Sequence, residues 1–328
     1  FYLLDPKRAR DGSIRPARPD YSHETPQMVE VYGLRELDDF RPFFDELYET
    51  CDIQGLPLES AISEFAPGQC ELTLRYKPDV LRACDDAIMY KRVVKAVAHA
   101  HGLEATFMAK PFAEQAGSGM HIHVSMNDAD GKNLFASDDP EGTPMLRHAI
   151  GGMISAVGDC FALFAPHANS YRRFKANSYA PVAPTWGVNN RTVSFRIPAG
   201  PAASRHVEHR ACGADANPYL AVAGVLAGLL GVGGGIVLVP AFFYVFGALG
   251  YDGPQLMQMC LGTSLATIIV TSVRSVLSHN KKGAVGWDIL RTWAPGIVIG
   301  AGLGVMVAAS MRSGALQMIF GVLAFIVG

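Results

Sequence analysis

The spacing of hydrophobic residues predicts helices and strands up to about residue 218 and long apolar segments after it. Apolar residues at helical spacing predict helices over 37–48, 79–101 and 145–164. Apolar and polar residues alternate in the segments expected to form strands, which are 56–76 around a Pro67-Gly68 turn, 105–109, 120–126, 192–197 and 206–211. We therefore expect a region of mixed helices and strands first, and a region of apolar helices after it.

Charged residues become rare after residue 218. Residues 1–218 hold 51 charged side chains, whereas residues 219–328 hold 7. Uncharged stretches of 36, 21, 20 and 16 residues follow one another after Asp215, and the last of them runs to Gly328. Because a helix needs about 20 apolar residues to cross a bilayer, we expect about four transmembrane segments, the last one truncated, and contact with a lipid bilayer through residues 219–328.

The few charges of this second region predict its orientation. Lys281, Lys282 and Arg291 lie in the loop 279–291, and Lys and Arg gather on the cytoplasmic side of membrane proteins. We therefore expect a cytoplasmic first region, attached to the inner (cell) membrane through the C-terminal segments.

The overall composition argues against three other classes of protein. The chain holds 28 Lys and Arg residues against 30 Asp and Glu residues, so we expect no nucleic-acid partner. Its six cysteines are scattered without a C-x-x-C pair, which argues against a zinc finger and against a secreted disulfide scaffold.

Two glutamates flank the predicted Pro67-Gly68 turn. If the turn is centred on these two residues, Glu64 and Glu71 lie opposite each other across the hairpin, where like charges repel. A divalent cation with oxygen ligands would resolve the repulsion. The alternative is a solvated pair of carboxylates on an exposed hairpin.

A glycine-rich segment leads into a strand with two histidines. In the run from Gly117 to Ser125, alternation places His121, His123 and Ser125 on one face of the strand. Two imidazoles and a hydroxyl beside a glycine loop suit a metal and phosphate oxygens. The alternative is a pair of histidines on a wet sheet face.

A glutamate and several arginines extend this candidate chemistry. Alternation places His206, Glu208 and Arg210 on one face of the last predicted strand, so Glu208 could bind a metal and Arg210 an anion. Further arginines lie near predicted loops at Arg172, Arg173, Arg191 and Arg196. The alternatives are a surface ion pair and ordinary solvated arginines. Taken together, carboxylates, an imidazole and arginines indicate a metal and phosphate site for phosphoryl transfer.

Five motifs in the first region resemble the catalytic domain of the glutamine synthetase superfamily. They are EFAPGQCE at 64–71, GSGMHIH at 117–123, NSYRRF at 169–174, PTWGVNNR at 184–191, and VEHR with GADANPYL within 207–220. The resemblance covers about residues 1–228. It implies an α+β fold with a curved antiparallel sheet and flanking helices, bound Mg²⁺ or Mn²⁺, and a homo-oligomer. It also implies an ATP-dependent ligase that joins glutamate and an amine through γ-glutamyl phosphate.

The resemblance implies a role for each matching residue. The implied metal ligands are Glu64, Glu71, His121 and Glu208. The implied nucleotide contacts are Glu59, His123, Ser125 and Arg196. Gly117, Arg173 and Arg210 would hold glutamate, Arg191 would bridge phosphate and substrate, and Arg191 and Arg210 are the expected catalytic residues.

Three departures from the family pattern modify this expectation. Tyr179 stands where true glutamine synthetases have a flap glutamate for ammonium, so the chain is more similar to γ-glutamyl polyamine or monoamine ligases and Tyr179 would contact the amine. His206 stands where the family usually has an arginine near the nucleotide. The sequence begins at Phe1, just after the family's E-x-E metal strand. We therefore expect two metal ligands to be missing and activity to be impaired.

The second region resembles the first half of a TauE/SafE-type permease. The resemblance covers about residues 224–328 and depends on GLLGVGGGIVLVP at 228–240, LGTSLATIIVTS at 261–272, HNKKGAVGWDILR at 279–291 and PGIVIGAGLG at 295–304. It implies export of sulfite or organosulfonate-type anions.

Two functional interpretations follow from these resemblances. The first is a γ-glutamyl amine ligase, with residues 1–228 as its catalytic domain and residues 229–328 as a membrane half-domain. The alternative is a permease fragment that exports anions and carries a soluble passenger. The joint falls on a short string that both families share, which indicates a fused or rearranged chain.

Overall fold

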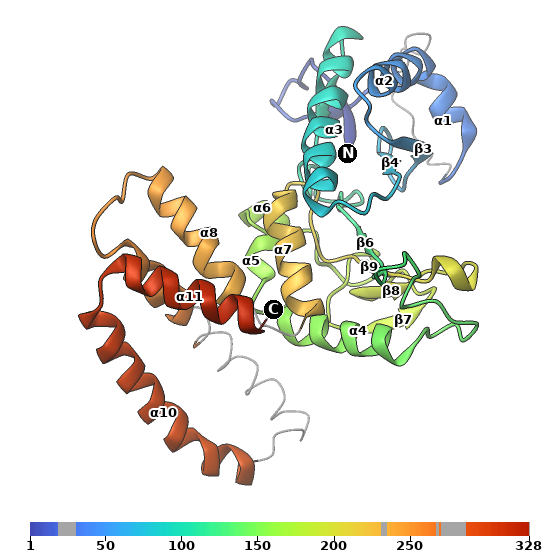
Figure 1. Ribbon diagram of the computed structural model, residues 1–328. Coiled ribbons are helices and arrows are strands. Elements are labelled where there is room, and N and C mark those ends of the chain that lie inside the picture. Colours follow the sequence, from blue (N-terminus) through green and yellow to red (C-terminus); the bar gives the residue numbers. More distant parts are fainter. Residues whose placement is uncertain (19–30, 231–234, 267–268, 270–286, 328) are drawn as a thin grey trace. The chain divides into compact units, whose positions relative to one another are not determined.

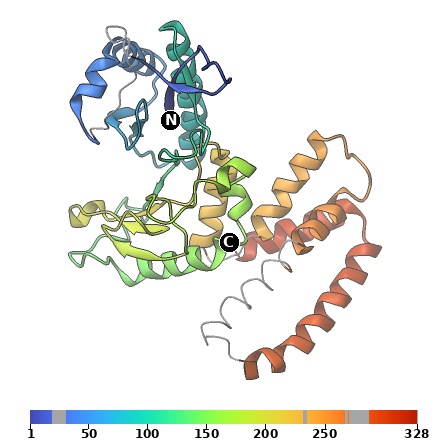
Figure 2. The ribbon, with the colours of Figure 1, turned by 180° about the vertical axis from the view of Figure 1, so that it is seen from behind.

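The computed structural model describes residues 1–18, 31–230, 235–266, 269 and 287–327 (Figure 1). The chain forms two compact units. The first consists of Phe1–Arg147 and Ala162–Val222, and the second of His148–Phe161 and Ala223–Gly328. The chain passes between them within α4 (Pro144–Ala156), α5 (Phe161–Phe164) and α7 (Pro218–Leu229) (Figure 2).

The first unit combines short strands with helices. Its strands are β1 (Tyr2–Asp5), β2 (Arg15–Pro16), β3 (Leu58–Ser63), β4 (Cys70–Leu74), β5 (Glu104–Thr106), β6 (Ile122–Val124), β7 (Trp186–Val188), β8 (Phe195–Ile197) and β9 (Val207–His209). Its other helices are α1 (Leu34–Asp39), α2 (Arg41–Ile53), α3 (Val80–Ala100), α6 (Ala168–Tyr171) and the 3-10 turn η1 (Ala202–Ser204). The predicted α+β class is confirmed.

The strands form three separate sheets, with the orders β2-β1-β5, β3-β4 and β6-β9-β8-β7. Neighbouring strands are antiparallel except β7 and β8, which are parallel. The expectation of a single antiparallel sheet is therefore wrong for the described residues. β7 and β8 hold only three residues each, so the loop 189–194 is long enough to return to the start of β7 and pair the two strands in parallel. Asn189 in this loop has a left-handed φ of 49°.

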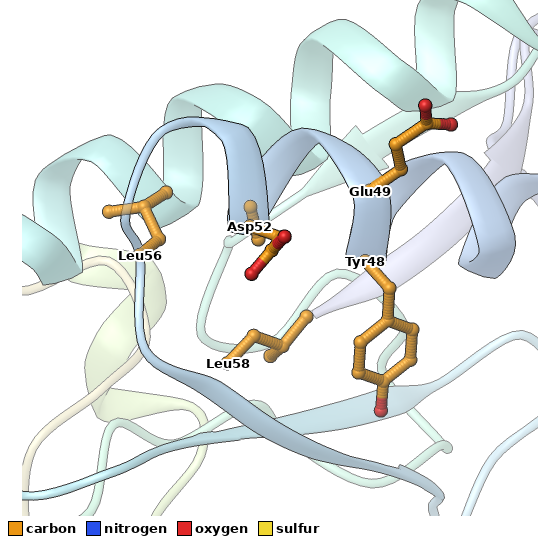
Figure 3. A pocket seen from close by; sticks show the side chains of 6 residues that line it. Tyr48, Glu49, Asp52, Leu56 and Leu58 are labelled. Carbon is orange, nitrogen blue, oxygen red and sulfur yellow. The ribbon is translucent and has the colours of Figure 1, made fainter.

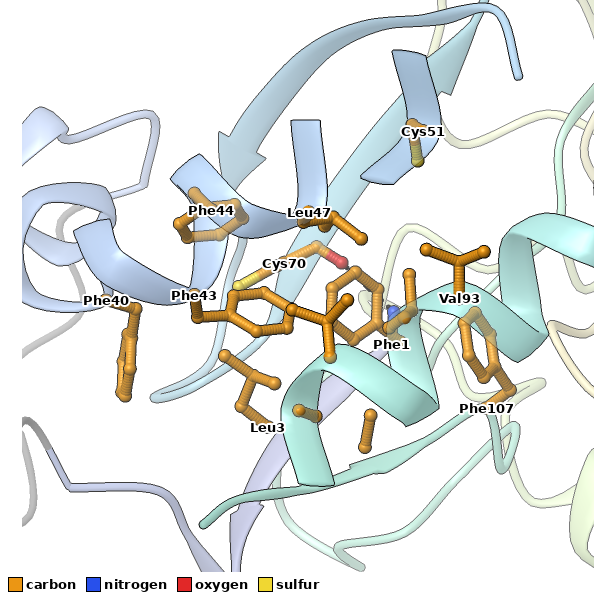
Figure 4. Packing of buried hydrophobic residues seen from close by; sticks show 14 of the residues in the cluster. Phe1, Leu3, Phe40, Phe43, Phe44, Leu47, Cys51, Cys70, Val93 and Phe107 are labelled. Atoms are coloured by element: carbon orange, nitrogen blue, oxygen red, sulfur yellow. Dashed lines mark hydrogen bonds between the residues drawn. The ribbon is translucent and has the colours of Figure 1, made fainter. Parts of the chain in front are cut away.

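The long helix predicted over 79–101 is confirmed as α3. It begins after Asp79, whose side chain accepts a hydrogen bond of 3.0 Å from the backbone N of Arg82 and so caps the helix. Val93, Val94 and Val97 on its buried face join the main core. Figure 4 shows this core, in which aromatic residues from α2 and from the segments around β1 and β5 pack together.

The helix predicted over 145–164 is interrupted. α4 ends at Ala156, and a separate turn of helix, α5, follows at Phe161–Phe164. Gly158 lies in the gap, and glycine lowers helix stability by roughly 1 kcal/mol relative to alanine.

The second unit continues with α8 (Gly235–Ala248), α10 (Trp287–Ser310) and α11 (Ser313–Val327). Val239, Met257, Cys260 and Leu316 form its small buried core. Among the helices that the structure describes, none is both long enough and apolar enough to cross a membrane. Lys281, Lys282 and most of the loop 279–291 lie outside the described residues, so the predicted topology stays a prediction.

Candidate active site

The hairpin of β3 and β4 carries the first two candidate residues, but in a different register from the predicted one. Ile62, not Glu64, lies opposite Glu71, and the backbone N of Glu64 donates to Gln69 O at 2.9 Å. The predicted direct opposition of Glu64 and Glu71 is therefore wrong. The reason is the loop Phe65–Gly68: it holds four residues, so its centre lies between Ala66 and Pro67.

Glu64 and Glu71 are nevertheless close neighbours. In this register they are diagonal partners on one face of the hairpin, a separation that long side chains span. Burial, followed by the neighbouring carboxyl group of Glu71, raises the pKa of Glu64 to about 7. Both residues are half-buried, so a fully solvated pair does not describe them.

Glu208 lies at the centre of a second cluster, built on β6, β9 and β8. Its side chain is only 2% exposed. Arg196 Nη1 donates to Glu208 Oε2 at 2.8 Å, Arg210 Nη1 donates to Oε1, and His121 Nδ1 lies 3.1 Å from Oε1. Arg196 is the direct cross-strand partner of Glu208, which explains one of these contacts.

The charge state of this cluster follows from its contacts. Burial alone would favour the neutral acid, but the hydrogen bond and charge of His121 and the charge of Arg210 lower the pKa of Glu208. Glu208 is therefore an ionised, buried partner of two guanidinium groups. The alternative of a surface ion pair is wrong for this residue.

Arg173 lies beside this cluster and is also buried, at 4% exposure. It donates to Ala211 O at 2.9 Å and to Arg210 O at 2.8 Å. Burial lowers the pKa of Arg173 to about 10, which leaves it charged at neutral pH. The alternative of an ordinary solvated arginine is therefore wrong for Arg173 and Arg210, while Arg191 is exposed.

The glycines of the GSGMHIH motif make room for this arginine. A Cβ on Gly117 would lie 2.7 Å from Arg173 Cγ and 2.9 Å from the backbone O of Ala109. A Cβ on Gly119 would lie 2.7 Å from Arg173 Nη2 and 3.0 Å from His121 Nε2. Any larger residue at either position would push the guanidinium or the imidazole away.

Among the other predicted residues, His123 lies directly opposite Glu208 in the β6–β9 pair, next to the second cluster. His123 Nδ1 lies 2.9 Å from His206 Nε2, so the histidine that replaces the family's arginine contacts a predicted nucleotide residue. Ser125 is exposed, and Glu59 is an exposed residue 3.9 Å from Arg75 Nε. Arg191 Nη1 donates to the hydroxyl oxygen of Tyr32.

Tyr179 is half-exposed, and its ring centroid lies 4.9 Å from that of Phe65. Its backbone is left-handed, with a φ of 56°. The contact places an aromatic residue of the loop after α6 against the tip of the hairpin that carries Glu64.

The four predicted metal ligands stand as two pairs. Glu64 contacts Glu71, and His121 contacts Glu208. Across the described residues, no three His, Cys, Asp or Glu side chains gather as a metal site would require. The Glu64–Glu71 pair suits a divalent cation, because a positive charge between two neighbouring carboxylates offsets their repulsion. Glu208 already has two guanidinium partners in this arrangement.

Comparison with known proteins identifies the family of the chain. Residues 1–242 match the family model described as glutamine synthetase, catalytic domain. The chain belongs to the glutamine synthetase family. Residues 219–328 match the family model of the sulfite exporter TauE/SafE, so the two matches overlap at 219–242. The resemblances that the motifs indicated are confirmed at this level.

Individual relatives are γ-glutamyl amide synthetases. The chain is 43% identical over 230 residues to the γ-glutamylputrescine synthetase PuuA of Escherichia coli (strain K12), which is 70% of this chain and 49% of that protein. It is 45% identical over 179 residues to a γ-glutamylethanolamide synthetase of Streptomyces coelicolor, which is 54% of this chain and 38% of that protein. The chain thus spans about half or less of the length of these relatives.

A solved structure of a GmaS–ADP complex has the same fold. It is 28% identical to this chain with a TM-score of 0.60, and the match covers 89% of this chain and 70% of that one.

A hollow beside the end of α2 is not part of this glutamine synthetase site. It has a volume of about 370 Å³, and Figure 3 shows the side chains that line it. Its lining residues are Tyr48, Glu49, Cys51, Asp52, Leu56 and Leu58. None of these six is a residue that the family motifs predict.

Sequence reasoning missed several residues that support the site. Glu36 accepts hydrogen bonds from the hairpin loop, Gln69 Nε2 donates to Gly117 O at 3.1 Å, and Tyr32 contacts Arg191. Gln69 lies inside the EFAPGQCE motif, so the sequence could have marked it as a candidate site residue. Tyr32 and Glu36 lie about 30 residues before the hairpin, and no local pattern marks them.

Proposed function

We propose that the first unit is the catalytic part of an ATP-dependent ligase that forms a γ-glutamyl amide from glutamate and an amine. The observation that supports this most directly is that Arg196 and Arg210 both bind the buried Glu208, with the buried Arg173 bound to the backbone beside them. Guanidinium groups held this way suit the carboxylates of glutamate and the phosphates of a nucleotide. The names of the relatives and the ADP complex of the structural neighbour point to the same chemistry.

The reaction proceeds in two displacements. The γ-carboxylate oxygen of glutamate attacks the γ-phosphorus of ATP, the bond to the β-phosphate oxygen breaks, and ADP leaves. The amine nitrogen then attacks the carbonyl carbon of γ-glutamyl phosphate, phosphate leaves, and the nitrogen loses a proton. Arg191 and Arg210 lower the barrier by stabilising the negative charge on the transferred group.

The remaining residues bind and orient the substrates. Gly117, Arg173 and Arg210 hold glutamate, with Arg173 fixed by its two backbone acceptors. Arg196, His123, Ser125 and Glu59 contact the nucleotide. Correct placement of the two reactants supplies much of the rate enhancement in such a reaction.

Glu64 and Glu71 are the residues that best fit the Mg²⁺ or Mn²⁺ of the family, and His121 and Glu208 complete the proposed ligand set. When bound, the cation would neutralise phosphate oxygens and favour attack by the carboxylate. Ionised Glu64 is the form that binds it.

We expect the amine to carry an apolar chain. The rings of Tyr179 and Phe65 form a neutral, half-exposed aromatic surface that can cover such a chain. Putrescine or ethanolamine should therefore be used with a kcat/KM at least about tenfold above that of ammonium, since a few contacted methylenes contribute 1–3 kcal/mol each. The measurement is glutamate-dependent ADP release by the full chain with each amine. Tyr179→Glu should move the preference toward ammonium, and turnover with ammonium equal to that with the amines would contradict the proposal.

A second candidate function concerns residues 219–328, which we propose to lie in the cytoplasmic membrane as the permease part of the chain. On α10, the consecutive residues Ile297, Val298 and Ile299 are each more than 60% exposed, and so is Met306. Apolar residues on every side of a helix are typical of lipid contact. The full chain should therefore stay with membranes through an alkaline carbonate wash. Release into the supernatant would contradict membrane insertion, and sulfite efflux from vesicles that contain the chain would support anion export.

A further inference from the structure

A buried carboxylate bridges the two ends of the hairpin loop that carries Glu64. Glu36 of α1 is only 7% exposed. Ser63 Oγ donates to Glu36 Oε2, and the backbone N of Gly68 donates to Glu36 Oε1 at 3.1 Å. Ser63 is the last residue of β3, and Gly68 is the last residue of the loop, so one carboxylate holds both sides of Glu64.

Two further contacts hold the same loop from other directions. The backbone N of Leu3 donates to Gly68 O at 2.8 Å, and Gln69 Nε2 donates to Gly117 O at 3.1 Å. Gly68 has a φ of 71°, and a Cβ there would lie 2.8 Å from Leu3 O. The loop is therefore packed against β1, α1 and the glycine-rich segment. Glu36 is the side chain that joins its two ends.

We propose that Glu36 is a positioning residue that holds the Glu64–Glu71 pair in the geometry for a divalent cation. This inference rests on the proposed function of that pair. Glu64 follows Ser63 directly, so a loop that opens at Ser63 carries the Glu64 carboxylate away from Glu71. Removal of Glu36 would also leave the buried N–H of Gly68 without its acceptor. Residues that orient metal ligands in this way typically change metal affinity by about 10–100-fold.

The test is Mn²⁺ binding to the purified full chain at pH 8, measured by calorimetry, with thermal melting recorded for each variant. Glu64→Gln should abolish binding, which tests the cation site itself. Glu36→Ala should raise the Kd about 10–100-fold. Glu36→Gln should bind almost as well as the wild type, because its amide can accept from Gly68 N and donate to Ser63 Oγ. Asp38→Ala is the matched control, since Asp38 is an exposed acidic residue of the same helix.

The outcomes separate the two proposals. A Kd for Glu36→Ala within about twofold of the wild type, while Glu64→Gln loses binding, would overturn the role of Glu36 and leave the cation site intact. Undiminished binding by Glu64→Gln would overturn the cation site itself. If Glu36→Ala fails to fold, Ser63→Ala removes one of the two hydrogen bonds and should still weaken binding and speed amide exchange at Gly68; no change in either would overturn the proposal.

Discussion

Replacing Glu208 with alanine is expected to destabilise the first unit by about 3–5 kcal/mol, the usual cost of removing one partner from a buried ion pair. Glu208 is 2% exposed and accepts from both Arg196 and Arg210. The side chains of these arginines are 13% and 6% exposed, so water cannot replace the lost carboxylate. The substitution leaves two neighbouring guanidinium groups with no negative charge between them.

Urea unfolding at pH 7 measures this effect, and the chain offers a matched control. Glu104 forms an ion pair with Arg8 at 2.7 Å, but their side chains are 45% and 40% exposed. Exposed pairs contribute less than about 1 kcal/mol, so Glu104→Ala should change stability little. Equal losses for Glu208→Ala and Glu104→Ala would show that the buried cluster contributes no more than a surface pair.

The contribution of Glu208 should also appear in the pH dependence of the free energy of unfolding. The pKa of Glu208 is lowered in the folded protein, chiefly because the contacts with His121 and Arg210 outweigh burial. Its contribution is therefore fully present above the ordinary carboxyl value of about 4.5 and is lost as the pH falls below it. Glu208→Gln should be less stable than the wild type at pH 7 and should lose less stability between pH 5 and pH 3.

Local sequence pattern was sufficient to predict most of the helices and strands. It also predicted that Glu208, in β9, and Arg210, just after it, lie on the same face. α3 lies where apolar spacing and an N-terminal aspartate place it. Alternation along β9 correctly predicts that Glu208 and Arg210 share a face, because a strand's two-residue period depends on no distant residue. The glycine motif indicates a metal and phosphate oxygens, whereas the group that lies against Gly117 and Gly119 is Arg173.

What the sequence could not predict depends on contacts between distant segments. Glu36 and Leu3 bind Gly68 of the β3–β4 hairpin from other elements of the chain, and no local pattern marks these contacts. β7 and β8 pair in parallel although only a short loop separates them, which the alternation within each strand does not indicate. Side chains such as Gln69 acquire their role only when a partner from elsewhere in the chain lies within hydrogen-bonding distance.

The second large effect is expected in the pH dependence of cation binding at Glu64 and Glu71. Burial and the neighbouring Glu71 raise the pKa of Glu64 to about 7. A cation must therefore displace a proton from Glu64 whenever the pH lies below that value, and metal affinity falls as protons compete. For a single proton, the apparent Mn²⁺ affinity should drop about tenfold between pH 8 and pH 6, far above the range in which an ordinary glutamate titrates.

Glu71→Gln separates this explanation from a general loss of structure. The substitution removes the neighbouring negative charge, so the pKa of Glu64 should move down toward 4.5, although burial still opposes ionisation. Mn²⁺ binding should then be weaker at pH 8, because one ligand charge is lost, and should fall less between pH 8 and pH 6 than in the wild type. The exposed control Glu104→Gln should retain the wild-type profile. A wild-type affinity that stays constant from pH 8 to pH 6 would mean that Glu64 is already ionised without the cation, and would contradict its raised pKa.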